Sequence, residues 1–507
     1  MSPAPLLTEE DSSTEKESPT EEEPSTEGGE PERNTTFWLL GLCLGIGLQL
    51  MTLWLEPPAG MDINAWRCAG LAMMMAVFWS VEILPIAVTA LLPLVMAPVL
   101  GLASIDKVAT PYAHPVIFLF MGGFAIGLAM ERWNLHRRIA LNIMLAVGTG
   151  EQRQILGFMV ATALISMWVS NTATTIMMLP IGMSVVAMMR KDGNMSSGFP
   201  PALLLAIAYG ASIGGFGTLI GTPPNALLAA FLQEQYDIHI GFSQWLLIGV
   251  PASLLMLIVT GWWLSKGGYR LNSGDLASIR SSLVEQQKNN GSMERGEKWV
   301  AAIFLLTAIS WIARPWLNEV VPSLSLSDTS IALMALFLLF TIPVSLKNLE
   351  FLMSWQDMRR LPWDVLLLFG GGLSLAAVIR RTGLAEWIAA TLDFLGGMPP
   401  LMVIAMVVTV IIFLTEVTSN TATTAAFLPP LGALAVSLGM EPAMLAIPAA
   451  IAASCAFMLP VATPPNAIIY GAGMVTIRQM MRSGLILNLA GIIIITLLCE
   501  WLVGKVF

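Results

Sequence analysis

Charged residues are scarce in this sequence: Asp, Glu, Lys and Arg make up 12% of its 507 residues, whereas apolar residues make up 56%. Soluble domains carry about twice that charged fraction, so a large soluble core is excluded. Apolar runs such as 67–101, 155–189 and 401–438 exceed the roughly 20 residues that cross a bilayer as a helix. We therefore predict an all-α, polytopic protein embedded in the lipid bilayer.

Cysteine and histidine are also rare. The four cysteines are scattered through apolar segments without a Cys-x-x-Cys spacing, which excludes a disulfide framework and a zinc site. The three histidines, His114, His136 and His239, are too dispersed to predict a metal cluster. We expect no organic cofactor and no nucleic-acid partner.

The formal net charge of −9 arises within residues 1–36, which hold ten Glu and one Asp against one Lys and one Arg. Their Ser, Thr, Pro and Glu content predicts a disordered, acidic, cytoplasmic tail, which is either an interaction segment or a solvated extension. No basic stretch precedes Phe37, so 37–55 is predicted to be a first membrane helix and not a cleaved signal.

Two polar strings are duplicated inside the most apolar regions. Ser-Asn-Thr-Ala-Thr-Thr stands at 170–175 and again, 249 residues later, at 419–424. Thr-Pro-Pro-Asn-Ala stands at 222–226 and at 463–467. Polar groups and helix breakers are costly in hydrocarbon unless they line a cavity or are buried in protein. Their duplication indicates two repeats around one polar site, which is typical of a secondary transporter.

The duplication divides the chain into two membrane units. We predict a first membrane helix and repeat one over 37–264, with a re-entrant hairpin over 152–190. A polar, cytoplasmic linker follows over 265–298, and repeat two occupies 299–507 with its hairpin over 401–438. The alternative for each hairpin is two full membrane spans joined by a tight turn, which its length also allows.

Lys and Arg residues orient these segments. If both hairpins return to their own side, five basic clusters share one face with the N-terminus, and that face is predicted to be cytoplasmic. The exception is Arg380-Arg381, which falls outside. On this count the hairpins enter from opposite faces, so the repeats are inverted.

Oxygen-rich hairpin tips predict cation sites. A hydroxyl lies one helical turn before each string, at Ser166 and Thr415. The paired prolines free the carbonyls of Gly221 and Ala462 from helical hydrogen bonds. Hard cations prefer such oxygen ligands, so we predict one cation site per repeat. The alternative is that the hydroxyls merely bond to their own helices and the prolines merely kink them.

The helices that begin near Asn225 and Asn466 present positive dipole ends, which favour an anion near Thr222 and Thr463. Neither string contains Lys or Arg. Bound cations must therefore supply much of the counter-charge, and cation binding is expected to be coupled to anion binding.

Glu416 is an intramembrane carboxylate with no acidic match in repeat one, where Met167 stands. Such a group is a functional candidate. The residues leave three roles open for Glu416: proton carrier, a group that tunes the second cation site, or the partner of another helix through a residue such as Arg380.

These motifs resemble those of the divalent anion/sodium symporter family, also called the solute carrier family 13 group. Its hallmark is a pair of Ser-Asn-Thr motifs at the tips of two hairpins, each followed by a Pro-Pro-Asn-type helix break. The resemblance covers 37–507, and 454–469 also looks like the family signature, with Ile469 in place of Val.

The resemblance implies about eleven membrane helices, two hairpins, a homodimer and an elevator-type transport domain that moves against a scaffold. It assigns one Na⁺ site to Ser166, Ser170, Asn171 and Gly221. It assigns a second Na⁺ site to Thr415, Ser419, Asn420 and Ala462. It implies a substrate site made by Asn171, Thr172, Thr222, Asn420, Thr421, Thr463 and Pro464.

The resemblance also implies Na⁺-coupled symport of a C4-dicarboxylate such as succinate, malate or fumarate, across a bacterial inner (plasma) membrane with the N-terminus in the cytoplasm. Two alternatives stay within the family: Na⁺-coupled transport of sulfate or another divalent anion, and Na⁺-independent exchange of dicarboxylates. A membrane hydrolase with Ser170 or Ser419 as nucleophile is a third reading, but neither serine has a His or Lys base beside it in the sequence. We therefore expect a transporter and not an enzyme.

Overall fold

The computed structural model describes residues 35–148, 150–191, 195–272, 277–391 and 397–506, so nearly all of the predicted acidic tail lies outside the described residues. The first half contains α1 (Thr35–Trp54), α2 (Ile63–Val81), α3 (Ile86–Thr89), α4 (Leu92–Val99), α5 (Ile105–Ala109), η1 (Thr110–Ala113), α6 (Pro115–Arg132), α7 (Leu135–Val147), α8 (Glu151–Ser166), α9 (Asn171–Lys191), α10 (Phe199–Gly215), α11 (Pro223–Tyr236), α12 (Phe242–Trp262) and the π-helical turn η2 (Trp263–Gly267).

The second half is equally helical. It contains α13 (Ala277–Asn289), α14 (Arg295–Val320), η3 (Pro322–Leu324), α15 (Asp328–Thr341), β1 (Pro343–Ser345), β2 (Glu350–Phe351), α16 (Trp355–Met358), α17 (Trp363–Arg381), α18 (Leu384–Thr391), α19 (Pro400–Thr415), α20 (Asn420–Ser437), α21 (Ala443–Ala453), η5 (Pro460–Ala462), α22 (Pro464–Gly471) and α23 (Ile477–Val506). The strands β1 and β2 pair as a small antiparallel hairpin.

Six helical segments of the described chain are long and apolar enough to cross a membrane: Ile105–Arg132, Asn171–Lys191, Phe242–Gly267, Arg295–Val320, Trp363–Arg381 and Ile477–Val506. Six shorter apolar helices accompany them, one of which is the segment Trp38–Trp54 of α1. The prediction of a helical, polytopic membrane protein is therefore confirmed, apart from the small strand pair β1–β2.

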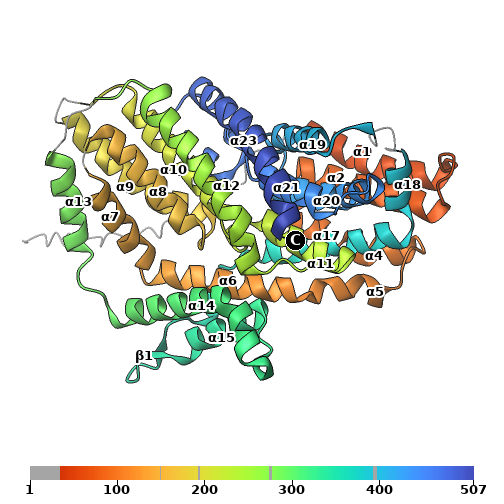
Figure 1. Cartoon of the computed structure of the whole chain (residues 1–507), viewed down its shortest axis with the longest axis horizontal. Helices are drawn as coiled ribbons and strands as arrows, with labels where there is room; N and C mark the ends of the chain where they lie inside the picture. Colours follow the sequence, from red (N-terminus) through yellow and green to blue (C-terminus); the bar gives the residue numbers. More distant parts are fainter. Residues whose placement is uncertain (1–34, 149, 192–194, 273–276, 392–396, 507) are drawn as a thin grey trace, which may run out of the picture.

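The two halves interlock through matching contacts. In Figure 1, α8, α9, α10 and α12 lie side by side on one side of the molecule, α19 to α21 lie on the other, and α5 and α6 run below both groups in this view. The short helix α11 contacts α20 and α21, and its counterpart α22 contacts α9 and α10. In each half, the helix that follows the Thr-Pro-Pro-Asn string therefore packs against helices of the other half. One of these is the helix that begins at the other half's Ser-Asn-Thr string, α20 or α9.

Small residues let the helices of the first group approach closely. A Cβ added at Gly210 of α10 would lie 2.7 Å from the carbonyl oxygen of Met159 on α8. That contact is too short for any side chain, so glycine is required there, as is common where membrane helices pack backbone against backbone. This close approach brings the end of α10 beside the start of α9.

Charged residues tie the helix ends to their connections. The Arg138 guanidinium lies 2.5 and 2.9 Å from the two Glu297 carboxylate oxygens, which joins α7 to α14. Arg132, at the end of α6, donates a hydrogen bond to Asp357 of α16. Burial raises the pKa of Asp357, but hydrogen bonds from Ser354 and the Arg132 guanidinium outweigh burial and hold that pKa below its usual value.

Candidate functional site

Each Ser-Asn-Thr string lies at a break between two helices. The helix α8 ends at Ser166 and α9 begins at Asn171, while α19 ends at Thr415 and α20 begins at Asn420. The hydroxyl oxygen of Ser170 accepts a hydrogen bond from the amide of Ala173 at 3.2 Å, which is the bond expected of a serine before a helix. The strings therefore start helices whose first residues are polar.

The side chains of Asn171 and Asn420 have matching surroundings. The hydroxyl of Ser166 lies 2.6 Å from Asn171 Oδ1 and 2.7 Å from a carbonyl oxygen of α10. The hydroxyl of Thr415 lies 2.8 Å from Asn420 Oδ1 and 2.9 Å from a carbonyl oxygen of α21. The same hydroxyl-to-amide contact is thus built twice, at positions 249 residues apart.

The Thr-Pro-Pro-Asn strings also adopt one conformation twice. Thr222 precedes α11 with φ −146° and ψ 144°, and Thr463 precedes α22 with φ −144° and ψ 150°. The prolines occupy the first helical positions, where a missing amide hydrogen is tolerated. The Asn225 amide donates to the Thr218 carbonyl at 2.8 Å, and the Asn466 amide donates to the Leu459 carbonyl at 3.0 Å. Each asparagine thereby holds the irregular backbone before its own helix.

All four strings meet at one cavity of about 1260 Å³. All seven residues predicted for the substrate site line it: Asn171, Thr172, Thr222, Asn420, Thr421, Thr463 and Pro464. Of the residues predicted for the cation sites, Ser170, Gly221, Ser419 and Ala462 also line the cavity, whereas Ser166 and Thr415 lie fully buried behind the two asparagines.

Four helix N-termini converge on this cavity, because the first residues of α9, α11, α20 and α22 are among its lining residues. Helix N-termini carry partial positive charge and free amide groups, which attract anions. The hydroxyl, amide and carbonyl oxygens beside them are ligands for hard cations. The arrangement can therefore bind an anion and cations side by side through non-covalent contacts alone.

The sequence missed charged residues in the cavity wall: Glu82, Glu131, His136, Arg360 and Asp364. They lie near the ends of α2, α6, α7 and α17, where hydropathy indicates only the margin of an apolar run. Glu131 accepts a hydrogen bond from Arg360. No motif in the sequence marked them as residues of the site.

Arg380 is not the partner of Glu416, so that residue was named wrongly, but Glu416 does have a side-chain partner on another helix, Asn488 of α23. Arg380 Nη1 donates to the carbonyl oxygens of Gln235 at 3.1 Å and Glu234 at 3.4 Å, at the end of α11. Glu416 instead accepts hydrogen bonds from the backbone after α21 and from Asn488 on α23. The sequence could not distinguish these partners, because both donors are distant along the chain.

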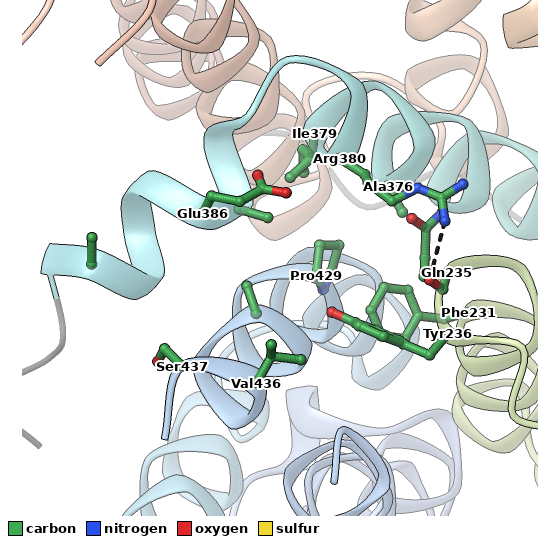
Figure 2. A pocket seen from close by; sticks show the side chains of 13 residues that line it. Phe231, Gln235, Tyr236, Ala376, Ile379, Arg380, Glu386, Pro429, Val436 and Ser437 are labelled. Atoms are coloured by element: carbon green, nitrogen blue, oxygen red, sulfur yellow. Dashed lines mark hydrogen bonds between the residues drawn. The ribbon is translucent and has the colours of Figure 1, made fainter. Parts of the chain in front are cut away.

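A second, smaller cavity of about 380 Å³ lies between α11 and α20 on one side and α17 and α18 on the other. Figure 2 shows Glu386 and Arg380 at its edge, with the Arg380 bond to Gln235 dashed. The 249-residue offset aligns Arg380 and Ala385, which line it, with Glu131 and His136, which line the large cavity. Two residues that line the small cavity thus stand 249 positions after two residues that line the large cavity.

A helical membrane protein with two polar helix breaks around one cavity belongs to the class of secondary transporters. The chain matches the family model of the sodium:sulfate symporter transmembrane region over residues 35–506. It therefore belongs to that family, which confirms the resemblance inferred from the motifs. The family consists of transporters, and the chain is not an enzyme.

Similar proteins support this assignment. The chain is 40% identical over 476 residues, 92% of each chain, to a protein of Staphylococcus saprophyticus named sodium-dependent dicarboxylate transporter SdcS. It is 40% identical over 469 residues, 90% of each chain, to a protein of the same name in Staphylococcus aureus.

Two solved structures share the fold. The YdaH transporter of Alcanivorax borkumensis has a TM-score of 0.55 at 15% identity and covers 93% of this chain and 98% of its own. MtrF of Neisseria gonorrhoeae has a TM-score of 0.54 at 14% identity and covers 92% of this chain and 94% of its own.

Proposed function

We propose that this chain is a secondary active transporter that couples the symport of a C4-dicarboxylate, such as succinate, malate or fumarate, to Na⁺. The observation that carries the proposal is the meeting of both duplicated strings at one cavity. The name of the staphylococcal relatives, sodium-dependent dicarboxylate transporter, supports the choice of ion and substrate.

The proposed Na⁺ sites use the oxygens that the two strings bring together. The first contains Ser166, Ser170, Asn171 and Gly221, and the second contains Thr415, Ser419, Asn420 and Ala462. Each Asn Oδ1 accepts one hydrogen bond from the hydroxyl behind it and keeps a second lone pair for a cation.

The dicarboxylate is proposed to bind between the two cation sites, against Asn171, Thr172, Thr222, Asn420, Thr421, Thr463 and Pro464. The strings hold neither Lys nor Arg, so helix N-termini and bound Na⁺ supply the positive charge. Each ion therefore lowers the cost of removing the substrate carboxylates from water, which couples the two binding events.

The proposed transport cycle uses two inverted repeats, each with a re-entrant hairpin, at 152–190 and 401–438, in a homodimer of the bacterial inner (plasma) membrane with a cytoplasmic N-terminus. The reciprocal contacts of α11 and α22 support the repeat relation. The unequal sizes of the two cavities support a cycle in which an elevator-type transport domain, containing α11 and α20, slides along a scaffold containing α17 and α18.

The first test is counterflow by the purified protein in liposomes loaded with succinate. Labelled succinate is expected to accumulate only when Na⁺ is present, because the cation sites must fill before the dianion binds. External malate and fumarate should compete and citrate should compete weakly. Competition by sulfate alone would favour a sulfate symporter, and accumulation without Na⁺ would contradict symport.

The second test fills the small cavity. Ala433→Phe places a ring between α20 and α17, so the proposed sliding of α20 must overcome overpacking of about 1–3 kcal/mol, which corresponds to uptake slower by roughly 5- to 150-fold. Val410→Phe on α19, where the side chain is 52% exposed, is the matched control. Wild-type uptake by Ala433→Phe, with an unchanged melting temperature, would contradict motion at this interface.

A further inference from the structure

Glu416 is a buried carboxylate beside the second Ser-Asn-Thr string, with 4% of its surface exposed. Its Oε1 accepts hydrogen bonds from the amides of Phe457 at 2.8 Å and Met458 at 2.9 Å, and from Asn488 Nδ2 at 2.7 Å. Its Oε2 accepts from the amides of Met458 at 3.0 Å and Leu459 at 3.1 Å. Every bond is accepted, which is the pattern of an ionised carboxylate.

The charge of Glu416 has no cationic partner in the described part of the chain, where no Lys, Arg or His nitrogen lies within 4.0 Å of its carboxylate. Glu297, which is equally buried, is paired with Arg138. A buried charge is costly unless it is paired, so the structure leaves Glu416 in need of a positive charge. Thr415, the adjacent residue, belongs to the proposed second Na⁺ site.

The amides that Glu416 holds belong to the backbone that completes this site. Residues 457–459 lead directly into η5, which ends at Ala462, and Thr463 then precedes α22. The Phe457 carbonyl also accepts a hydrogen bond from Tyr209 at 2.9 Å. A displaced Glu416 would therefore displace the segment that carries Ala462 and Thr463 into the cavity.

Repeat one holds the same break with neutral groups. Met167 occupies the position of Glu416, and the Thr218 hydroxyl donates to the Met167 carbonyl at 2.5 Å. The two proposed Na⁺ sites thus have similar oxygen ligands on the side of the cavity, but they differ in the charge of the buried residue next to them. Only the second has a carboxylate one residue away.

We propose that Glu416 is a positioning residue for the second Na⁺ site, and that its charge makes this site bind Na⁺ more tightly than the first. It holds the 457–459 backbone through three amides and provides counter-charge from behind Thr415. The inference rests on the proposed Na⁺-coupled function, and it explains why the two otherwise matching repeats differ at this position.

The test measures Na⁺ binding and uptake separately on the purified full chain. Na⁺ is titrated without substrate, with the melting temperature as readout, and then during succinate uptake into liposomes. Glu416→Gln is expected to raise the half-saturating Na⁺ concentration about tenfold, while the KM for succinate at saturating Na⁺ stays within about twofold. Glu416→Asp keeps the charge and should restore most of the Na⁺ response. Glu319→Gln, an exposed carboxylate near the end of α14 that lines neither cavity, is the matched control and should behave as wild type.

Asn488→Ala keeps the carboxylate but removes one of its donors, and is expected to raise the half-saturating Na⁺ concentration about threefold. If Glu416→Gln does not fold, the Na⁺ response of Asn488→Ala tests the proposal in its place. An unchanged Na⁺ response in Glu416→Gln, or in Asn488→Ala when the first variant is unfolded, would overturn this inference alone. If Na⁺ neither raised the melting temperature of the wild-type protein nor drove its succinate uptake, both the proposed function and this inference would be overturned.

Discussion

Asn171→Ala and Asn420→Ala are each expected to lower Na⁺-driven succinate uptake by about a hundredfold. Each asparagine is proposed to contact both a cation and the dianion, so its removal forfeits two interactions with charged groups. At about 1.5 kcal/mol each, these losses correspond to roughly two factors of ten. The measurement is initial uptake into liposomes over a range of Na⁺ concentrations.

Thr409→Ala is the matched control for these two variants. Its hydroxyl bonds to the Ala405 carbonyl at 2.7 Å within α19, so its loss removes a helix-side hydrogen bond without touching the cavity. The control is expected to transport at the wild-type rate. If either asparagine variant kept more than about a tenth of wild-type uptake at saturating Na⁺, that repeat would not contain a cation site of the proposed kind.

The duplicated strings were sufficient to predict much of the site. A polar string is tolerated at membrane depth only where it is buried in protein or lines a cavity. Two copies in matching positions were therefore expected to lie next to other polar groups. The structure places both strings and both Thr-Pro-Pro-Asn breaks on one cavity, with Ser166 and Thr415 behind their asparagines. Long apolar runs and helix-breaking residues likewise indicated the helices, because both depend only on neighbours along the chain.

Contacts between distant segments could not be predicted in this way. Most partners of Glu416 are backbone amides, and any residue type except proline supplies such an amide, so no sequence pattern marks them. The ion pair between Glu131 and Arg360 joins the ends of α6 and α17, whose approach depends on packing throughout the protein. Arg380 was considered as a partner for Glu416 because both residues lie in apolar runs. Hydropathy does not show toward which helix a side chain points, so it could not test that pairing.

Gly215→Ala is expected to reduce uptake as severely as loss of Asn171 itself. A Cβ at position 215 would lie 2.5 Å from Asn171 Oδ1 and 2.9 Å from Nδ2, far inside van der Waals contact. The amide must rotate away, and the rotation breaks its bond with Ser166. Because Ser166 and Asn171 share the first proposed Na⁺ site, we expect the half-saturating Na⁺ concentration to rise by about a hundredfold, equivalent to roughly 2.8 kcal/mol.

The matched control is Gly47→Ala on α1, where an added Cβ meets nothing within 4 Å. Alanine favours a helix interior by about 1 kcal/mol over glycine, so this control should be at least as stable as wild type and equally active. Gly215 is the last residue of α10, so alanine gains little helical preference there. The melting temperature without Na⁺ reports on stability and is expected to change little, whereas the stabilisation by added Na⁺ is expected to be lost. A Gly215→Ala protein that Na⁺ still stabilises at wild-type concentrations would show that Asn171 can leave its present position without loss of the ion, and the first site would then have to be built from other oxygens.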